Sequence, residues 1–248
     1  MKIAMIGSGG WGTAMVTSLA ARHDDLELYC RREEAARELK ETRENKEYLP
    51  GVRIPVHVKI TSDLEKAVSG ADCVVLSTPS KAVEITAEAM APFMKKNAVA
   101  VCASKGLADE AGHRLSEIIS EKFSSVTDRI VVLSGPNHAE EVGLGLPAAT
   151  VAASEVPEAV QIVQDVFYNI KVYIELHSGN RFYCYSATSI IVVLAGTLMV
   201  LTPKNSVFAV KSSPSKYSAL VLVSTCQCFP FGSTGSCITS GSQYAFMQ

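Results

Sequence analysis

The glycine-rich stretch GSGGWG, residues 7–12, constrains the fold most, because it joins two segments of different periodicity. Before it, KIAMIG (residues 2–7) is a short apolar run that is typical of a buried strand. After it, TAMVTSLAARH (residues 13–23) has the apolar spacing of a helix. A glycine-rich turn between a strand and a helix predicts the start of a βαβ unit.

The glycines of this turn have the spacing G-x-G-x-x-G at Gly7, Gly9 and Gly12. In such a turn the first glycine permits the tight bend, and the second lets a pyrophosphate approach the backbone. The third lets the helix pack closely on the strand, so that the helix N-terminus faces the phosphates. The stretch therefore predicts a dinucleotide site, with a purely structural turn as the alternative.

The alternation of strand and helix continues along the chain. Apolar runs predict strands at residues 26–30, 71–79, 97–104 and 129–135, with helices at 32–41, 81–94 and 109–123. Regular alternation of this kind implies parallel strands that are connected by helices on both faces of the sheet. The fold class that we expect is α/β, with a doubly wound, mostly parallel sheet of the Rossmann type.

The end of the second predicted strand bears on the choice of dinucleotide. Sites for NAD usually have an acidic residue there, which accepts hydrogen bonds from the ribose 2′-hydroxyl. This chain has YCRRE instead, with Arg31 and Arg32 at that position. Planar guanidinium groups suit a 2′-phosphate, so NADPH is favoured over NADH. A solvated charge cluster is the alternative, because Glu33 and Glu34 follow directly.

Charge and cysteine usage exclude some classes of function. The net charge of −2 gives no basic field for nucleic acid. The N-terminal MKIAMIG enters a strand at once, so we expect no signal peptide and a cytoplasmic, reducing location. The seven cysteines lack the spacing of a zinc site, apart from an isolated CQC at 226–228, and free thiols are expected, with no metal.

The composition changes near residue 175. All 25 acidic residues lie at or before Glu175, and the remaining 73 residues have none. We therefore expect a dinucleotide-binding domain at 1–175 and an atypical tail at 176–248, poorly ordered or incomplete. We hypothesise that a frame change, a retained intron or a mis-joined gene model produced the break. Sequencing the mature transcript across the junction tests this, and an unbroken reading frame there would count against it.

Part of the tail raises the question of a membrane. Residues 182–203 carry no charge, and aromatic residues stand at one end of the run. Serines, threonines and a glycine dilute it, however, and its continuous apolar part is about a dozen residues, which suits a core segment better than a bilayer span. We expect no membrane association, and keep a membrane-tethered module as an alternative.

Four motifs together resemble one family. GSGGWGTA, ETRENKEYLPG, SKG and SGPNHAEEV occur in the order seen in bacterial-type NAD(P)-dependent glycerol-3-phosphate dehydrogenase, over residues 1 to about 173. The resemblance implies hydride transfer between a nicotinamide and the pair glycerol 3-phosphate and dihydroxyacetone phosphate. It implies a small phosphorylated substrate, a role in glycerol phosphate metabolism and phospholipid biosynthesis, and NADPH or NADH as cofactor. A homodimer remains open.

The resemblance also assigns residues. Gly10, Trp11, Arg31, Arg32 and Ala139 match cofactor-contacting positions of the family. Lys105 matches a catalytic lysine at the mouth of the cleft, which lies near both the nicotinamide and the substrate.

Two further matches concern the substrate. Gly135 and Asn137, in GPNH, match substrate-contacting positions, although the family often has serine where Asn137 stands. Lys105 and GPNH both follow predicted strands, and ligands of open α/β sheets sit beyond the carboxyl ends of the strands, so both can face one cleft.

The resemblance fails in the second half. Family members have a helical domain there with a second lysine in a GALKN-like helix and an arginine in a TRG-like segment that holds the substrate phosphate. Here LAGTL at 194–198 approaches the first motif, but Met199 stands in the lysine's place and no TRG follows. The alternative function is therefore a non-catalytic NADPH-binding remnant without a complete substrate site.

Overall fold

The computed structural model describes residues 1–168 except 110, 111, 136, 147 and 149, together with the backbone of strands at 172–176, 191–194, 197–200, 219–226 and 239–247. The backbone divides into two compact units, Met1–Cys184 and Tyr185–Gln248. The assignment of residues 1–175 and 176–248 to a dinucleotide-binding domain and a tail stays a prediction.

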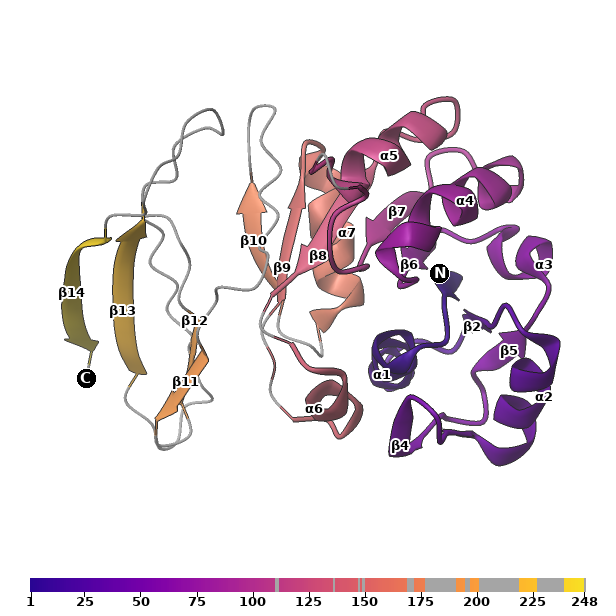
Figure 1. Cartoon of the computed structure of the whole chain (residues 1–248), viewed down its shortest axis with the longest axis horizontal. Helices are drawn as coiled ribbons and strands as arrows, with labels where there is room; N and C mark the ends of the chain where they lie inside the picture. Colours follow the sequence, from indigo (N-terminus) through magenta and orange to yellow (C-terminus); the bar gives the residue numbers. More distant parts are fainter. Residues whose placement is uncertain are drawn as a thin grey trace. The chain divides into compact units, whose positions relative to one another are not determined.

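The first unit alternates strands and helices along the chain (Figure 1). In chain order its elements are β1 (Ile3–Ile6), α1 (Gly10–Leu19), β2 (Leu26–Tyr29), α2 (Glu33–Thr42), β3 (Glu44–Asn45), β4 (Leu49–Arg53), β5 (Lys59–Thr61), α3 (Leu64–Val68), β6 (Cys73–Leu76), α4 (Ser80–Met90), the 3₁₀ helix η1 (Ala91–Phe93), β7 (Val99–Cys102), α5 (Leu115–Lys122), β8 (Ile130–Ser134), α6 (Ala139–Gly143), β9 (Thr150–Ser154), α7 (Pro157–Val166) and β10 (Val172–Leu176).

Eight strands form one sheet in the order β10-β9-β8-β7-β6-β1-β2-β5. The six strands β5, β2, β1, β6, β7 and β8, in this order across the sheet, all run parallel to one another. β9 pairs antiparallel with β8, and β10 pairs parallel with β9, so these two strands run opposite to the other six. The expectation of a mostly parallel, Rossmann-type sheet is confirmed.

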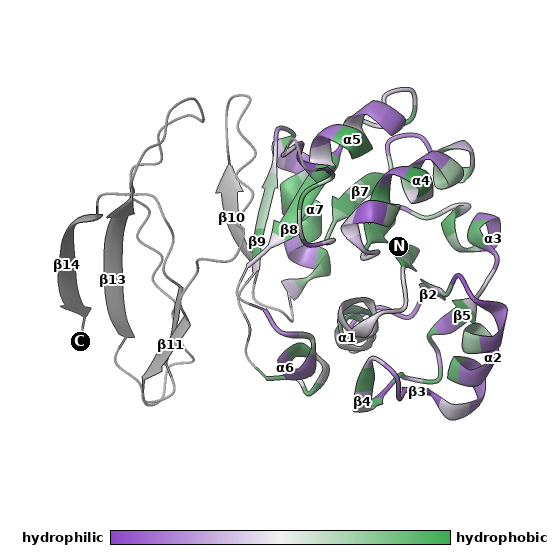
Figure 2. Ribbon diagram, in the orientation of Figure 1, coloured by the Kyte–Doolittle hydropathy of each residue, from purple (hydrophilic) through white to green (hydrophobic). Residues whose placement is uncertain are grey.

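Both faces of the sheet are covered, as the alternation of side chains along β1 shows. Ile3 and Met5 belong to one hydrophobic core, which α1, α2 and α7 complete. Ala4 and Ile6 belong to a second core, which α3, α4 and α5 complete. Strands buried on both faces are continuously apolar rather than alternating, and Figure 2 shows the central strands as hydrophobic with polar residues on the outer helices.

One predicted helix begins later than expected. The sequence predicts a helix at 109–123, but α5 spans only Leu115–Lys122. Asp109 instead accepts hydrogen bonds from the backbone N–H of His113, at 3.1 Å, and pairs with its ring. Gly112 has φ +88°, a left-handed conformation that a helix does not accommodate. The side chain of Asp109 thus competes with the helix for backbone donors, as aspartate commonly does before a helix.

The second unit contains two antiparallel pairs. β11 (Ile191–Leu194) pairs with β12 (Thr197–Val200), and β13 (Ala219–Cys226) pairs with β14 (Thr239–Met247). Most of the uncharged run 182–203 lies outside the described residues, and its described pieces are strands. Among the helices in the described part of the chain, none is long and apolar enough to cross a membrane. The sequence predicts a poorly ordered or incomplete tail at 176–248, and most of these residues lie outside the part of the chain that the structure describes.

Candidate dinucleotide site

The carboxyl ends of the parallel strands carry most of the predicted site residues. A cleft of about 760 Å³ opens there, next to the ends of β1, β2, β6 and β7. Among the residues lining it are seven that the sequence predicted, namely Gly7, Gly9, Gly10, Trp11, Arg31, Arg32 and Lys105. Gly12, Gly135, Asn137 and Ala139 are not part of the lining.

The glycine loop connects β1 directly to the N-terminus of α1. The backbone N–H of Thr13 donates to the carbonyl of Gly9 at 2.9 Å, which starts the helix at Gly10, three residues before the sequence pattern predicted. Gly7 has φ +115°, and a Cβ there would lie 3.0 Å from the carbonyl oxygen of Ser77. The first turn of α1 has no acidic residue, so its free N–H groups and positive end suit a phosphate.

The other three glycines of the loop differ in how much room a side chain would have. A Cβ on Gly12 would lie 2.0 Å from the carbonyl oxygen of Gly7, because α1 packs tightly onto the end of β1. A Cβ on Gly10 would lie 2.7 Å from the carbonyl oxygen of Tyr48. A Cβ on Gly9 would meet nothing within 4 Å, and the φ of −70° at Gly9 suits any residue. The protein itself therefore does not require glycine at position 9, whereas an approaching pyrophosphate does.

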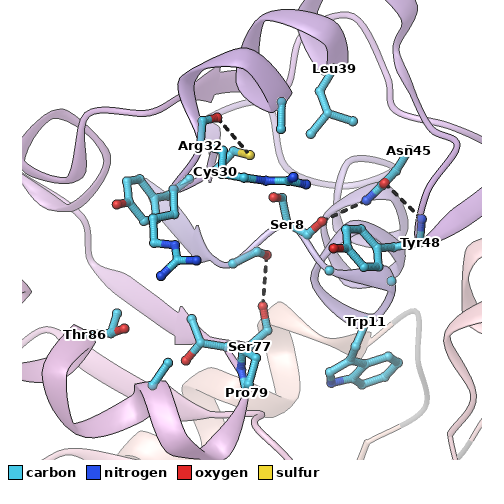
Figure 3. Close-up of a pocket in the computed structure, with 18 of the residues that line it drawn as sticks. Ser8, Trp11, Cys30, Arg32, Leu39, Asn45, Tyr48, Ser77, Pro79 and Thr86 are labelled. Atoms are coloured by element: carbon cyan, nitrogen blue, oxygen red, sulfur yellow. Dashed lines mark hydrogen bonds between the residues drawn. The ribbon is translucent and has the colours of Figure 1, made fainter.

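Two side chains from other parts of the chain fix the loop, as Figure 3 shows. The hydroxyl of Ser77, at the end of β6, donates to the carbonyls of Ile6 and Gly7 at 3.2 and 3.1 Å. The buried Asn45 donates from Nδ2 to the carbonyl of Ser8 and to the hydroxyl of Thr13, both at 2.8 Å. These contacts hold the loop in shape without a ligand.

Asn45 reaches the loop because α2 ends in a sharp reversal. Arg43 adopts φ 56°, in the left-handed region, and the chain then turns back through the short hairpin of β3 and β4. The N–H of Tyr48 donates to Oδ1 of Asn45 at 3.3 Å, so the hairpin closes around the amide. The sequence identified ETRENKEYLPG as a motif but predicted no role for its individual residues.

The hairpin also places Glu47 in the cleft, opposite the arginines at the end of β2. Arg32 Nη2 lies 2.8 Å from Glu47 Oε2, and both side chains are more than half exposed. Hydrogen bonds from Tyr48 and Arg32 lower the pKa of the Glu47 carboxyl, and the bond to Glu47 raises the pKa of Arg32. Both groups are therefore charged at neutral pH.

Lys105 lies after β7, at the edge of the cleft. Its Nζ donates to the backbone carbonyl of Asn137 at 3.0 Å and lies 5.5 Å from the centre of the Trp11 ring. Partial burial of the ammonium group lowers the pKa of Lys105, which the carboxylate of Glu140 partly offsets. The lysine thus connects the glycine loop to the segment after β8.

Asn137 and Ala139, which follow β8, make contacts within the protein. Asn137 is buried, its Nδ2 donates to the hydroxyl of Thr150 at 3.0 Å, and its Oδ1 has no hydrogen-bond partner among the residues that the structure describes. Ala139 begins α6, and its Cβ lies 3.7 Å from the place of a Cβ on Gly10. Asn137 therefore positions Lys105 through its backbone. A substrate contact for Gly135 and Asn137, and a cofactor contact for Ala139, stay predictions.

The two middle glycines of the loop provide a matched test. We expect Gly9→Ala to leave thermal stability unchanged and to weaken NADPH binding about tenfold or more, because the added methyl group occupies only open space where the pyrophosphate would lie. Gly10→Ala should lower the free energy of unfolding by about 1–3 kcal/mol, since its methyl group meets the Tyr48 carbonyl. Denaturant unfolding and calorimetric titration measure both effects, and equal behaviour of the two variants would contradict this assignment.

Comparison with known proteins identifies relatives for most of this unit. The family model for the N-terminus of NAD-dependent glycerol-3-phosphate dehydrogenase matches residues 2–160. Glycerol-3-phosphate dehydrogenase [NAD(P)+] of Moorella thermoacetica is 49% identical over 166 residues, which cover 67% of this chain and 49% of that protein. The enzyme of the same name from Chlorobium phaeobacteroides is 37% identical over 199 residues, covering 79% of this chain and 60% of that protein.

A solved structure has the same fold. Glycerol-3-phosphate dehydrogenase from Coxiella burnetii superposes with a TM-score of 0.63 at 24% identity, over 71% of this chain and 53% of that one. The chain spans about half the length of most of these relatives. On the match to residues 2–160, which is more than half of its 248 residues, the chain belongs to the NAD-dependent glycerol-3-phosphate dehydrogenase family.

Proposed function

We propose that the chain binds NADPH or NADH in the cleft and takes part in the interconversion of glycerol 3-phosphate and dihydroxyacetone phosphate. The observation that carries this proposal is the open backbone at Gly9, at the N-terminus of α1 and at the carboxyl end of a parallel sheet. The loop fits a dinucleotide because its shape is already fixed by Ser77 and Asn45 while the position facing the pyrophosphate is left clear.

Different residues of the cleft would bind different parts of the dinucleotide. The N–H groups of the first turn of α1 would hold the pyrophosphate, and Arg31 and Arg32 would hold the ribose end. The nicotinamide, when bound, supplies or accepts the hydride. Lys105, whose Nζ contacts the Asn137 carbonyl and lies near Trp11, would orient the substrate and polarise its carbonyl oxygen.

A non-catalytic NADPH-binding remnant is the second candidate. It is favoured by Met199, which stands where the family's second lysine would be, and by the lack of a TRG segment in the sequence. Substrate positioning supplies a large part of enzymatic rate enhancement, so a chain without these two groups should turn over very slowly. The cofactor site is the same under both candidates.

We also propose that the protein works in a reducing, cytoplasmic compartment. Cys30 and Cys73 are buried, and neither forms a disulfide with another residue that the structure describes. Burial raises the pKa of Cys73 to about 12, so this thiol stays protonated and inert at neutral pH. Association of two copies remains a proposal, for which the molar mass in solution is the test.

The two candidates separate in one assay on the full chain. We expect calorimetric titration to show tighter binding of NADPH than of NADH, because Arg31 and Arg32 suit a 2′-phosphate. Dihydroxyacetone phosphate is then added, and NADPH oxidation is followed by its absorbance. Oxidation that depends on this substrate supports the enzyme, and binding without oxidation supports the remnant. If neither cofactor binds, both candidates fail.

The partial burial of the Lys105 ammonium group predicts that its amine reacts faster with acylating reagents than the amines of Lys59 and Lys122. Because partial burial lowers its pKa, Lys105 should have a larger neutral fraction in mildly alkaline buffer than Lys59 or Lys122, whose pKa values are raised by Asp25 and Glu84. An amine-directed acylating reagent should therefore label Lys105 before Lys59 and Lys122, and NADPH should protect it. Peptide mass spectrometry measures the order of labelling. Labelling of Lys105 that is no faster than that of Lys59, or that is insensitive to NADPH, would contradict its placement at the cofactor.

A further inference from the structure

The ribose end of the cleft carries a carboxylate that the sequence pattern did not predict. Arg31 and Arg32 follow β2, at the position where sites for NAD usually have an acidic residue. The β3–β4 hairpin brings Glu47 to the same end of the cleft, where it pairs with Arg32. A cation and an anion therefore share the position that discriminates the two dinucleotides.

Glu47 differs from the other carboxylates near it. Glu44 also lines the cleft, but its Oε1 accepts a hydrogen bond from the backbone N–H of Gly51 at 2.9 Å and so supports the hairpin. Glu47 contacts Arg32, one of the proposed cofactor residues, at 2.8 Å. Glu47 is thus a carboxylate of the cleft lining whose charge acts directly on an arginine of the proposed site.

The pair between Arg32 and Glu47 can exchange partners. Both side chains are more than half exposed, and ion pairs in water contribute little to stability and are screened by salt. A 2′-phosphate can therefore take over Arg32, but the Glu47 carboxylate then faces a second anion. A 2′-hydroxyl can instead donate to Glu47 while Arg32 continues to hold the carboxylate in place.

We propose that Glu47 is a specificity-determining residue, which opposes the 2′-phosphate of NADPH and accepts the 2′-hydroxyl of NADH, so that the cleft takes both dinucleotides. It performs from the hairpin the role that an acidic residue at the end of the second strand performs in sites for NAD. This inference rests on the proposed function, because it requires that a dinucleotide binds in the cleft.

The test compares binding constants of four forms of the full chain, measured by calorimetry at low ionic strength. The forms are the wild type, Glu47→Gln, Arg32→Gln and the double variant. Glu41→Gln serves as the matched control, because Glu41 lies exposed on α2 outside the cleft lining and the change removes the same charge. Thermal unfolding of every variant shows that the fold is retained.

We expect Glu47→Gln to tighten NADPH binding about three- to fivefold and to weaken NADH binding about twofold, a shift in preference of about tenfold towards NADPH. The gain for NADPH should shrink at high ionic strength, which a merely structural effect would not do. In the Arg32→Gln background it should be smaller, because part of the Glu47 effect acts through Arg32. Glu41→Gln should leave the ratio of the two constants unchanged.

The outcomes separate this inference from the proposed function. If the wild type binds neither dinucleotide, the proposed function fails and the inference fails with it. If both dinucleotides bind but Glu47→Gln shifts their ratio no more than Glu41→Gln does, the inference alone is overturned. The same holds if Glu47→Gln weakens NADPH and NADH equally, since Glu47 would then only support the hairpin.

Discussion

The close approach of α1 to β1 is the constraint on which the rest of the site depends. Gly12 has so little room that a Cβ would lie 2.0 Å from the carbonyl oxygen of Gly7. Because of this approach, the N-terminus of α1 points to the space beyond the carboxyl ends of the parallel strands. Ser77 reinforces it from β6, since its hydroxyl donates to the carbonyl of Gly7. The dinucleotide cleft is thus a consequence of helix-to-strand packing.

The cleft is completed by contacts between segments far apart in the sequence. Asn45 fixes the glycine loop from the hairpin after α2, and Lys105 connects Trp11 to Asn137 after β8. The glycine loop and Lys105 are therefore preorganised, held by Asn45, Ser77 and the carbonyl of Asn137. Preorganised groups do not lose conformational freedom when the ligand arrives, which favours binding.

Local sequence patterns predicted the part of this arrangement that depends on neighbours along the chain. The apolar run before Gly7 and the glycine spacing predicted β1, the loop and α1, and the runs at 71–79 and 97–104 predicted parallel strands. Patterns could not show that Asn45 and Glu47 enter the cleft, because their positions depend on the left-handed turn at Arg43 and on pairing of the hairpin. The late start of α5 was missed because Asp109 competes for backbone donors. Similarly, no local pattern distinguishes the antiparallel β9 from a parallel strand, since both are buried apolar runs.

The similarity to the family extends past the change in composition. A match that covers 79% of a 248-residue chain spans about 196 residues, so the likeness to the Chlorobium phaeobacteroides protein continues beyond Glu175. The described residues that line the cleft nevertheless all lie in the first unit, between Gly7 and Lys105. We therefore expect dinucleotide binding from the first unit, whereas the proposed turnover would need further groups from the second half of the chain.

Trp11, the one tryptophan of the chain, lines this cleft and offers the most direct measurement. Excitation of its indole while NADPH is added to the full chain reports whether the reduced nicotinamide binds near the glycine loop. We expect saturable quenching of Trp11 with sensitised emission from the nicotinamide, both reversed by excess NADP⁺. Indole emission that stays unchanged up to millimolar NADPH, in protein whose fold is intact, would contradict the central claim that this cleft is a dinucleotide site.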